Sequence, residues 1–472
     1  MKEIFQSGQD SATLTMEADS LIQNPKKRKL NEEQGIDGNY KCFGNLHEVF
    51  LRHILSFLPI KDAVRTSVLS RRWEFLWTSN PNLNFGEPMP AKRTLLMNFV
   101  ERVLYLRDSP DIKEFVLDFD VQSDACRVKS WITAAVRRNV QILNIRLWDL
   151  RGQFSLPRCV FTCDTLTSFF LDMRCILKVP PLICFSNLKV LSIENVTFSD
   201  DYTTQQLLSG LPVLESLYFK KCRWGCRKVL SISAPKLRYL NIIEDDMQNP
   251  SDCQFMIFGA TLKVFVYTGE LFNEYCLCDS LSLESVDIEA ACDVEWPSDE
   301  RARQVAYRIF KVLIAIPNVK DLKLYGNAYE ALAHAAELLP KMPIFNNLWY
   351  LKLGSLDLEC AALLKILQNS PCLETLKILQ IDPISDREKA DIILDPMPSC
   401  FLSHLTRIKV YSYDGKNDLY AVKILLKKAI ALDEMVICFE ESLEENLEMQ
   451  DYLYKQLIKL PKGSHNCEIV FK

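Results

Sequence analysis

The chain has 472 residues, of which 48% are hydrophobic and 25% are charged, and its formal net charge is -5. This composition is typical of a folded globular protein, and the length suits two or three domains or one extended array of repeats. The acidic balance argues against a chain that coats nucleic acid or an anionic membrane along its whole length.

The first residues, MKEIFQSGQDSATL, lack the apolar run of a secretory signal, and no stretch approaches the roughly 18 consecutive apolar residues of a membrane span. We therefore expect an intracellular protein without a membrane partner, whose 17 cysteines are reduced thiols. The spacings of Cys159 with Cys163 and of Cys222 with Cys226 are not followed by a second Cys or His pair. The sequence therefore predicts no metal site, and nothing in it indicates a cofactor.

Residues 1–40 are rich in Gln, Asn, Ser, Asp and Lys and show little apolar periodicity, which predicts a disordered arm. Within this arm, the string PKKRKL contains four consecutive cations, Lys26, Lys27, Arg28 and Lys29. The string resembles a monopartite nuclear localisation signal, and the alternative is a solvated basic tail. We predict a nuclear protein, with the cytoplasm as an additional compartment.

Residues 45–80 predict three short helices. In the first, apolar residues recur at three-to-four spacing and predict one apolar face; they are Leu46, Val49, Phe50, Ile54, Phe57 and Leu58. Pro59 is expected to end this helix, and a second helix is predicted from Lys61 to Leu69. Ser70 stands where a cap is expected before a third helix, RRWEFLWTS.

The run LRHILSFLPIKDAVRTSVLSRRWEFLW resembles a plant F-box in its ILSFLP, AVRTSVLS and RRW blocks, and we place this domain at 41–85. The resemblance implies docking on the Skp-type adaptor of a cullin-RING ubiquitin ligase. It assigns seven residues to that docking or to the packing that supports it: Leu46, Ile54, Leu55, Leu58, Val64, Val68 and Trp73.

The chain departs from the F-box pattern at one position. His47 stands where the family usually has proline after the first leucine. Proline suits the start of a helix because of its fixed φ and its missing N–H. Its loss is expected to weaken docking by something like 1 kcal/mol.

Beyond residue 110, a pattern of apolar-x-x-apolar-x-apolar recurs at intervals of 21–26 residues and then at wider intervals. It starts at Val140, Leu166, Leu188, Leu214, Leu237, Leu262, Leu283, Val319, Leu348, Leu373 and Leu405. Periods in the twenties with this pattern predict leucine-rich repeats, which we place at 110–395. The wider interval after Leu283 contains RARQVAYRIFKVLIAI, which has a helical period and is expected to pack on the convex side.

Each repeat is expected to contribute one strand whose first, fourth and sixth pattern residues enter a shared core, while the alternate residues face the opposite, concave side. Aromatic and charged residues at these outward positions form a candidate target-binding surface, although a solvated strand face is the plainer interpretation for any one of them. They are Ser192, Glu194, Tyr218, Lys220, Tyr239, Asn241, Lys323, Tyr325, Tyr350 and Lys352.

Residues 396–472 resemble the FBD domain that follows the repeats in many plant F-box proteins, in the blocks VKILLKKAIALDEM and LPKGSHNCEIVF. A strand from Leu405, a helix around Val422, a strand from Met435, a second helix and a last strand are expected here. The predicted fold is therefore α/β: a three-helix F-box, then an irregular, horseshoe-like leucine-rich-repeat solenoid with a parallel sheet, closed by an FBD cap.

No motif of a catalytic site is present: the chain has no Gly-rich phosphate loop, no HExxH and no GxSxG, and its five histidines are scattered. We therefore predict a non-catalytic subunit of an SCF-type ubiquitin ligase. Its F-box is expected to bind a Skp-type adaptor, and through it a cullin and a RING protein, while its repeats bind a target protein that the sequence does not identify. The alternative is a nuclear repeat scaffold whose F-box, weakened at His47, recruits no ligase.

Overall fold

The computed structural model describes residues 46–86, 93–150, 154–225, 229–244, 252–290, 298–326, 328–384, 394–415, 418–440 and 447–471. The predicted disordered arm and its basic cluster, Lys26 to Lys29, lie outside the described residues. The chain divides into two units, Met1–Val116 and Leu117–Lys472, and each is described by itself.

The first unit packs short helical segments around a small core. These elements are α2 (Glu48–Leu55), α3 (Ile60–Arg65), the 3₁₀ segments η1 (Thr66–Val68) and η2 (Leu76–Ser79), strand β1 (Asn82–Phe85) and helix α4 (Arg93–Leu106). Around α2 and α3 the core consists of Leu51, Leu55, Ile60, Ala63, Leu76 and Trp77. The buried side chain of Asn80 donates to the carbonyl oxygen of Leu55 at 3.1 Å, and this oxygen also accepts from the backbone N–H of Leu58 at 3.1 Å, so the end of α2 is bonded to the segment that follows η2.

The third predicted helix is not an α-helix. Residues 71–75 form turns, and η2 follows. The hydroxyl groups of Thr78 and Ser79 donate to the carbonyl oxygens three residues before them, Phe75 at 2.6 Å and Leu76 at 3.0 Å. These local bonds favour the tighter 3₁₀ spacing over an α-helix.

The second unit is built on one continuous sheet whose strands follow one another in chain order, and every neighbouring pair from β3 onward is parallel. The strands are β2 (Glu114–Gln122), β3 (Ile142–Leu150), β4 (Ser168–Met173), β6 (Val190–Glu194), β8 (Ser216–Lys220), β11 (Tyr239–Ile243), β13 (Val264–Gly269), β15 (Ser285–Ala290), β16 (Asp321–Gly326), β17 (Tyr350–Leu356), β18 (Thr375–Ile381), β19 (Arg407–Tyr413), β20 (Glu434–Phe439) and β21 (Glu468–Phe471). This is the α/β parallel-sheet repeat fold that the periodicity predicts.

The repeated pattern explains this sheet. From β4 to β19, the strands begin two residues after the first apolar residue of the pattern, and buried and half-buried side chains alternate along them. The residue just before each strand also donates its backbone N–H to the preceding repeat: Lys263 donates to Arg238 at 2.8 Å, and Glu284 donates to Lys263 at 2.9 Å. Each strand therefore depends on its neighbour both for its core and for its backbone hydrogen bonds.

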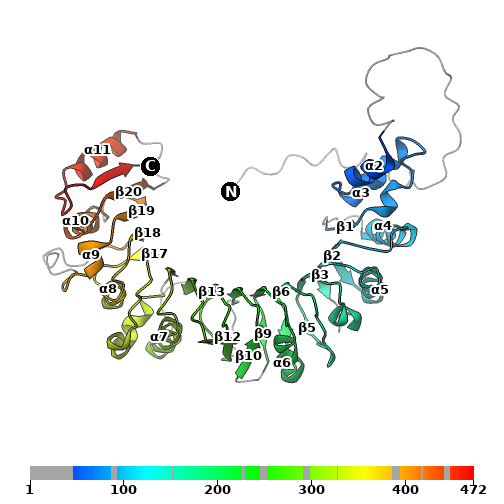
Figure 1. The fold of residues 1–472 in the computed structure, drawn as a ribbon, viewed down its shortest axis with the longest axis horizontal. Helices are drawn as coiled ribbons and strands as arrows, with labels where there is room; N and C mark the ends of the chain where they lie inside the picture. Colours follow the sequence, from blue (N-terminus) through cyan, green and yellow to red (C-terminus); the bar gives the residue numbers. More distant parts are fainter. Residues whose placement is uncertain are drawn as a thin grey trace, which may run out of the picture. The chain divides into compact units, whose positions relative to one another are not determined.

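Helices cover one face of the sheet and leave the other face open, which is the inner side of the sheet's curve in Figure 1. We call this second side the open face. The covering elements are α5 (Ala125–Val136), η4 (Arg158–Thr162), α6 (Asp201–Ser209), α7 (Asp299–Ile314), η5 (Ala331–Lys341), α8 (Ala361–Gln368), α9 (Ser399–Ser403), α10 (Asp418–Lys428) and α11 (Leu447–Ile458). Helix α7 is the one that the wide interval after Leu283 predicts.

Two small parallel sheets, which the sequence does not predict, take the place of helices behind the middle repeats. One has the order β5 (Ile176–Leu177), β7 (Thr197–Phe198), β9 (Arg223–Trp224). The other has the order β10 (Val229–Ser233), β12 (Gln254–Phe258), β14 (Glu274–Cys278). Their aromatic side chains fill the layer behind the main sheet: Trp224 stacks on Phe198 with 4.8 Å between ring centroids, and Phe255 stacks on Tyr275 at 5.3 Å.

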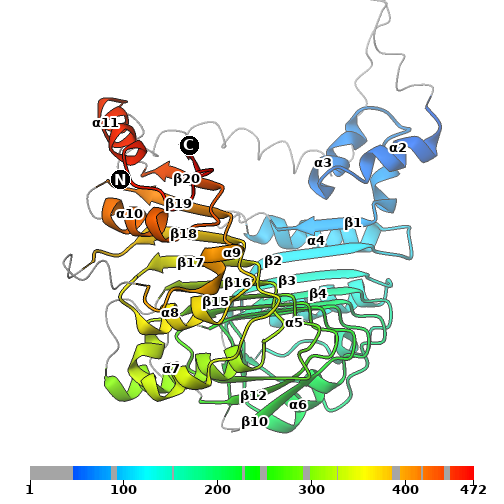
Figure 2. The same ribbon diagram turned by 60° about the vertical axis from the view of Figure 1, so that its left-hand side comes forward.

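The closing segment adds to the same sheet. Strands β19, β20 and β21 continue the parallel order without a break, with α10 between β19 and β20 and α11 between β20 and β21 (Figure 2). The expected succession of strand, helix, strand, helix and strand is thus present.

Candidate functional site

The first unit exposes a set of large apolar side chains. Val49, Phe50, Ile54 and Phe57 on and just after α2, with Val68, Leu69 and Phe75, are all exposed, and Phe57 reaches 73%. The sequence predicts one apolar face on this helix, and four of its six residues are exposed while Leu46 and Leu58 are half-buried. The helix buries Leu51 and Leu55, which are not part of that face. So many large apolar side chains exposed on one small unit are typical of a protein-binding surface. We call these seven residues the docking set.

The seven residues that the F-box resemblance implies are divided between the inside and the outside of this unit. Ile54 and Val68 belong to the docking set, whereas Leu55 is fully buried and can only support that surface from within. Four are half-buried: Leu46, Leu58, Val64 and Trp73. Sequence reasoning did not single out the other five members of the docking set, which are Val49, Phe50, Phe57, Leu69 and Phe75. For those near α2, the available signal was the second apolar pair of the helix, Leu51 and Leu55, which can close the core without them.

His47 occupies the N-cap position of α2. Its backbone is extended, with φ of -63° and ψ of 146°, and its Nδ1 accepts a hydrogen bond from the backbone N–H of Val49 at 3.4 Å. This φ is the value at which a proline ring is fixed. The imidazole therefore supplies a weak cap in the place of the conformational restriction that a proline would impose.

The ten outward residues of the repeats all lie half-buried on the open face. Register brings six of them together on β6, β8 and β11, where Ser192, Tyr218 and Asn241 stand side by side and the rings of Tyr218 and Tyr239 are 5.1 Å apart. The other four lie on β16 and β17, with Lys323 beside Lys352. Strands β13 and β15 separate the two groups, so they are two patches on one face.

A row of lysines crosses the second patch. Lys323, Lys352, Lys377 and Lys409 stand in register on the four consecutive strands β16 to β19. We call this row the lysine ladder. Sequence reasoning missed Lys377 and Lys409, although each is the fifth residue of its repeat, as are Lys323 and Lys352.

Tyrosine rings accompany the ladder. The ammonium groups of Lys352, Lys377 and Lys409 lie over the rings of Tyr325, Tyr350 and Tyr411, at 5.3, 5.0 and 4.3 Å from the ring centroids. Burial raises the pKa of Tyr325 to about 12, so its hydroxyl is protonated at neutral pH and can donate a hydrogen bond.

An acidic pocket lies at the carboxyl ends of β15 to β18. Its volume is about 740 Å³, and Glu289, Tyr325, Glu330, Asp357 and Asp382 are among its lining residues. Burial, together with the nearby charges of Asp382 and Asp357, raises the pKa of Glu330 to about 7. Burial also raises the pKa of Asp357. The open face therefore changes from basic to acidic along these strands.

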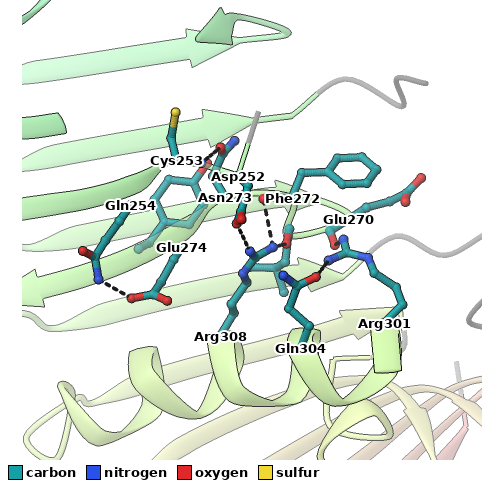
Figure 3. Close-up of polar contacts among 12 residues, drawn as sticks. Asp252, Cys253, Gln254, Glu270, Phe272, Asn273, Glu274, Arg301, Gln304 and Arg308 are labelled. Atoms are coloured by element: carbon teal, nitrogen blue, oxygen red, sulfur yellow. Dashed lines mark hydrogen bonds and ion pairs between the residues drawn. The ribbon is translucent and has the colours of Figure 1, made fainter. Parts of the chain in front are cut away.

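A buried polar network ties helix α7 to the loop before β14 (Figure 3). Nη1 of Arg308 donates to the carbonyl oxygens of Leu271 at 2.6 Å and Phe272 at 2.8 Å, and Nη2 pairs with Asp252. Arg301 donates to the carbonyl oxygen of Glu270 at 2.6 Å. These donors all bind acceptors within the unit, so the network holds the fold together and is not a ligand site.

The described parts of the chain offer no group of three or more His, Cys, Asp or Glu side chains arranged to hold a metal ion. Every cysteine in the same ranges is a free thiol. None of the helices that the structure describes is long and apolar enough to span a membrane.

Family models match part of each unit. The model of the F-box domain matches residues 43–85, and the model of the leucine-rich repeats of FBD-associated F-box protein At5g56370 matches residues 128–255. Among curated Arabidopsis thaliana proteins, F-box/FBD/LRR-repeat protein At5g56420 is 28% identical over 439 residues, which cover 90% of this chain and 97% of that protein. F-box/LRR-repeat protein 13 of the same organism is 26% identical over 438 residues, which cover 90% of this chain and 95% of that protein.

Among solved structures, the chain aligns with a TLR13-ssRNA13 complex at 12% identity and a TM-score of 0.34, over 77% of this chain and 53% of that one. The relationship rests instead on the two family models and on relatives that align along nine tenths of the chain. The resemblance seen in the sequence is thus confirmed: the chain carries an F-box match and a match to FBD-associated leucine-rich repeats, and it is similar to Arabidopsis F-box/FBD/LRR-repeat proteins along nine tenths of its length.

Proposed function

We propose that the chain is the substrate-recognition subunit of an SCF-type ubiquitin ligase. Its F-box would bind a Skp-type adaptor and, through it, a cullin and a RING protein, while the open face of its repeats would hold a target protein. Ubiquitin transfer would then depend on raised effective concentration, to which this chain contributes position and no reacting group.

The docking set is the observation that supports this proposal. Seven large apolar side chains stay exposed on a unit whose own core is already closed by Leu51, Leu55 and Trp77. Water contact with such a surface is unfavourable by roughly 25 cal/mol for each Å² of apolar area, so a partner that covers it gains binding free energy. The match of the F-box model to residues 43–85 supports a Skp-type adaptor as that partner.

The test is capture of a purified plant Skp-type adaptor by the full chain. We expect wild type to capture it and Phe57→Asp/Val68→Asp to lose capture. Both side chains are exposed, so the variant keeps its fold. The control is Tyr105→Asp, which places the same charge on an aromatic side chain that is 84% exposed in the same unit but lies outside the F-box match.

Two results would overturn the proposal: no capture by wild type, or capture that the double aspartate variant retains. Failure by wild type together with capture by His47→Pro would identify an F-box that has lost its adaptor. The scaffold interpretation would then replace the ligase interpretation.

We also propose nuclear localisation, for which the cluster Lys26 to Lys29 is the support. Replacing these four cations with glutamine in a fluorescent fusion of the full chain is expected to shift the protein from the nucleus to the cytoplasm. An unchanged nuclear signal would contradict a role for this cluster.

A further inference from the structure

The lysine ladder is an unusual use of a sheet surface. Neighbouring strands are about 4.8 Å apart, so four ammonium-bearing side chains follow one another over roughly 14 Å. Like charges directly opposite one another on adjacent strands destabilise a sheet. The arrangement nevertheless recurs at the same position of four consecutive repeats.

Few carboxylates within the fold neutralise this row. Lys323 lies 3.8 Å from an oxygen of Asp287 on β15. Among the described residues, Lys352, Lys377 and Lys409 form no ion pair with a carboxylate and lie over tyrosine rings instead. The other charged groups of these strands on the open face are Asp321, near the first three lysines, and Arg407, which is already paired with Glu434 at 2.5 Å. The row therefore carries a net positive charge.

From this arrangement we infer that the lysine ladder binds a short acidic segment of the target protein. The inference rests on the proposed function, and it names the chemical class that the repeats would recognise. Carboxylates three or four residues apart on a helix are about 5–6 Å apart, and those on one side of a strand are about 6.8 Å apart, so flexible lysine side chains can reach either. The tyrosine rings add apolar contact and hydroxyl donors, which suit a polypeptide.

The acidic pocket argues for a short segment and against a long polyanion. Glu289, Glu330, Asp357 and Asp382 lie at the carboxyl ends of the strands that bear the ladder. A nucleic acid has a negative charge at every phosphate and would meet these carboxylates as it left the ladder. An acidic stretch of a protein can end after a few residues and avoid them.

The experiment is fluorescence anisotropy of the full chain with a labelled oligo-glutamate peptide, with oligo-glutamine as the uncharged comparison. We expect wild type to bind the glutamate peptide alone, and binding to weaken with salt. Lys352→Gln/Lys377→Gln is expected to weaken it about five- to tenfold, because each exposed ion pair contributes a fraction of a kcal/mol. The control is Lys236→Gln/Lys341→Gln, which removes the same charge at exposed positions away from the ladder and is expected to bind as wild type does.

A charge reversal sharpens the test. Lys352→Glu/Lys377→Glu is expected to lose oligo-glutamate and to gain binding of labelled oligo-lysine. Equal oligo-glutamate affinity in wild type and the ladder variant would overturn the inference, and so would tighter ladder-dependent binding of single-stranded DNA or an inositol polyphosphate. The assay contains no adaptor, so its failure beside normal adaptor capture rejects the acidic-segment class and leaves the ligase proposal intact.

Discussion

Lys323 on β16 and Asp287 on β15 form an ion pair at 3.8 Å, and among the described residues no other lysine of the ladder has such a partner. The lysines are equivalent in register but not in their availability to an anion. The charge of Lys323 is partly neutralised by its ion pair with Asp287, whereas Lys377 lies between two further lysines, Lys352 and Lys409.

This difference predicts unequal effects on peptide binding. Lys323→Gln is expected to weaken oligo-glutamate binding less than Lys377→Gln does. Asp287→Asn is expected to strengthen it about two- to fivefold, because it releases Lys323 from its ion pair. Anisotropy titrations at low and high salt measure all three. Weaker binding by Asp287→Asn would contradict this account of the ladder.

Substitutions at Leu55 and Phe57 are expected to have different effects: one lowers the stability of the F-box, and the other prevents adaptor binding. Leu55→Ala should destabilise the first unit by about 2–5 kcal/mol, because it leaves a cavity among fully buried neighbours. Phe57→Asp should leave stability nearly unchanged and still prevent adaptor capture. Urea unfolding followed by tryptophan fluorescence, beside the capture assay, distinguishes the two; a large stability loss in Phe57→Asp would show that its side chain is part of the core.

His47→Pro is expected to fold normally, because the backbone φ of -63° at this position already matches proline. Proline at a compatible site lowers the entropy of the unfolded chain and so raises the free energy of unfolding by about 0.4–1 kcal/mol. Loss of the imidazole cap lowers the free energy of unfolding by a similar amount. Unfolding midpoints of the two proteins should therefore agree closely. Stronger adaptor capture by the variant would then report a direct contact of the proline ring with the adaptor.

Glu330 makes the stability of the second unit depend on pH. Its pKa rises from 4.5 to about 7 in the folded chain, so the folded state binds a proton that the unfolded state releases. The ionised Glu330 carboxylate lowers the free energy of unfolding. This loss of stability is fully present above about pH 7 and disappears as the pH falls toward 4.5. Glu330→Gln should therefore raise the melting temperature at pH 8 and leave it unchanged at pH 4.5. Glu374→Gln, at an exposed carboxylate, is the control and should change neither.

Arg308→Met should destabilise the second unit by about 2–4 kcal/mol, since the carbonyl oxygens of Leu271 and Phe272 lose a buried charged donor. Arg303→Met on the same helix is the matched control. That side chain is exposed and pairs with Glu337 at the surface, so less than about 1 kcal/mol is expected. Hydrogen exchange at residues 271–273 should accelerate in the first variant alone. Unchanged exchange there would mean that the loop is held by other contacts.

The repeats could be predicted from sequence because every strand carries the same apolar pattern, and that pattern determines where the strand begins and which of its residues are buried. The first apolar residue, the strand that starts two residues later and the outward positions all follow from it, down to the half-burial of Tyr218 and Lys352. The small sheet of β5, β7 and β9 could not be predicted, because strands of two residues carry no period. Similarly, α2 has apolar residues on both sides, and the choice of Leu51 and Leu55 for the core depends on contacts with Trp77 and Leu76 from later in the chain.

The sequential order of the strands has a consequence for how the protein is made. Each strand of the second unit pairs with a neighbour that left the ribosome earlier, and its backbone N–H groups find their acceptors there. No strand of this unit needs a partner strand from a distant, later part of the chain. The array can therefore fold during synthesis, each repeat adding to the sheet once it has left the ribosome. The lysine ladder is then completed only when β19 has joined the sheet, so a chain released before that point would present fewer than four of its charges.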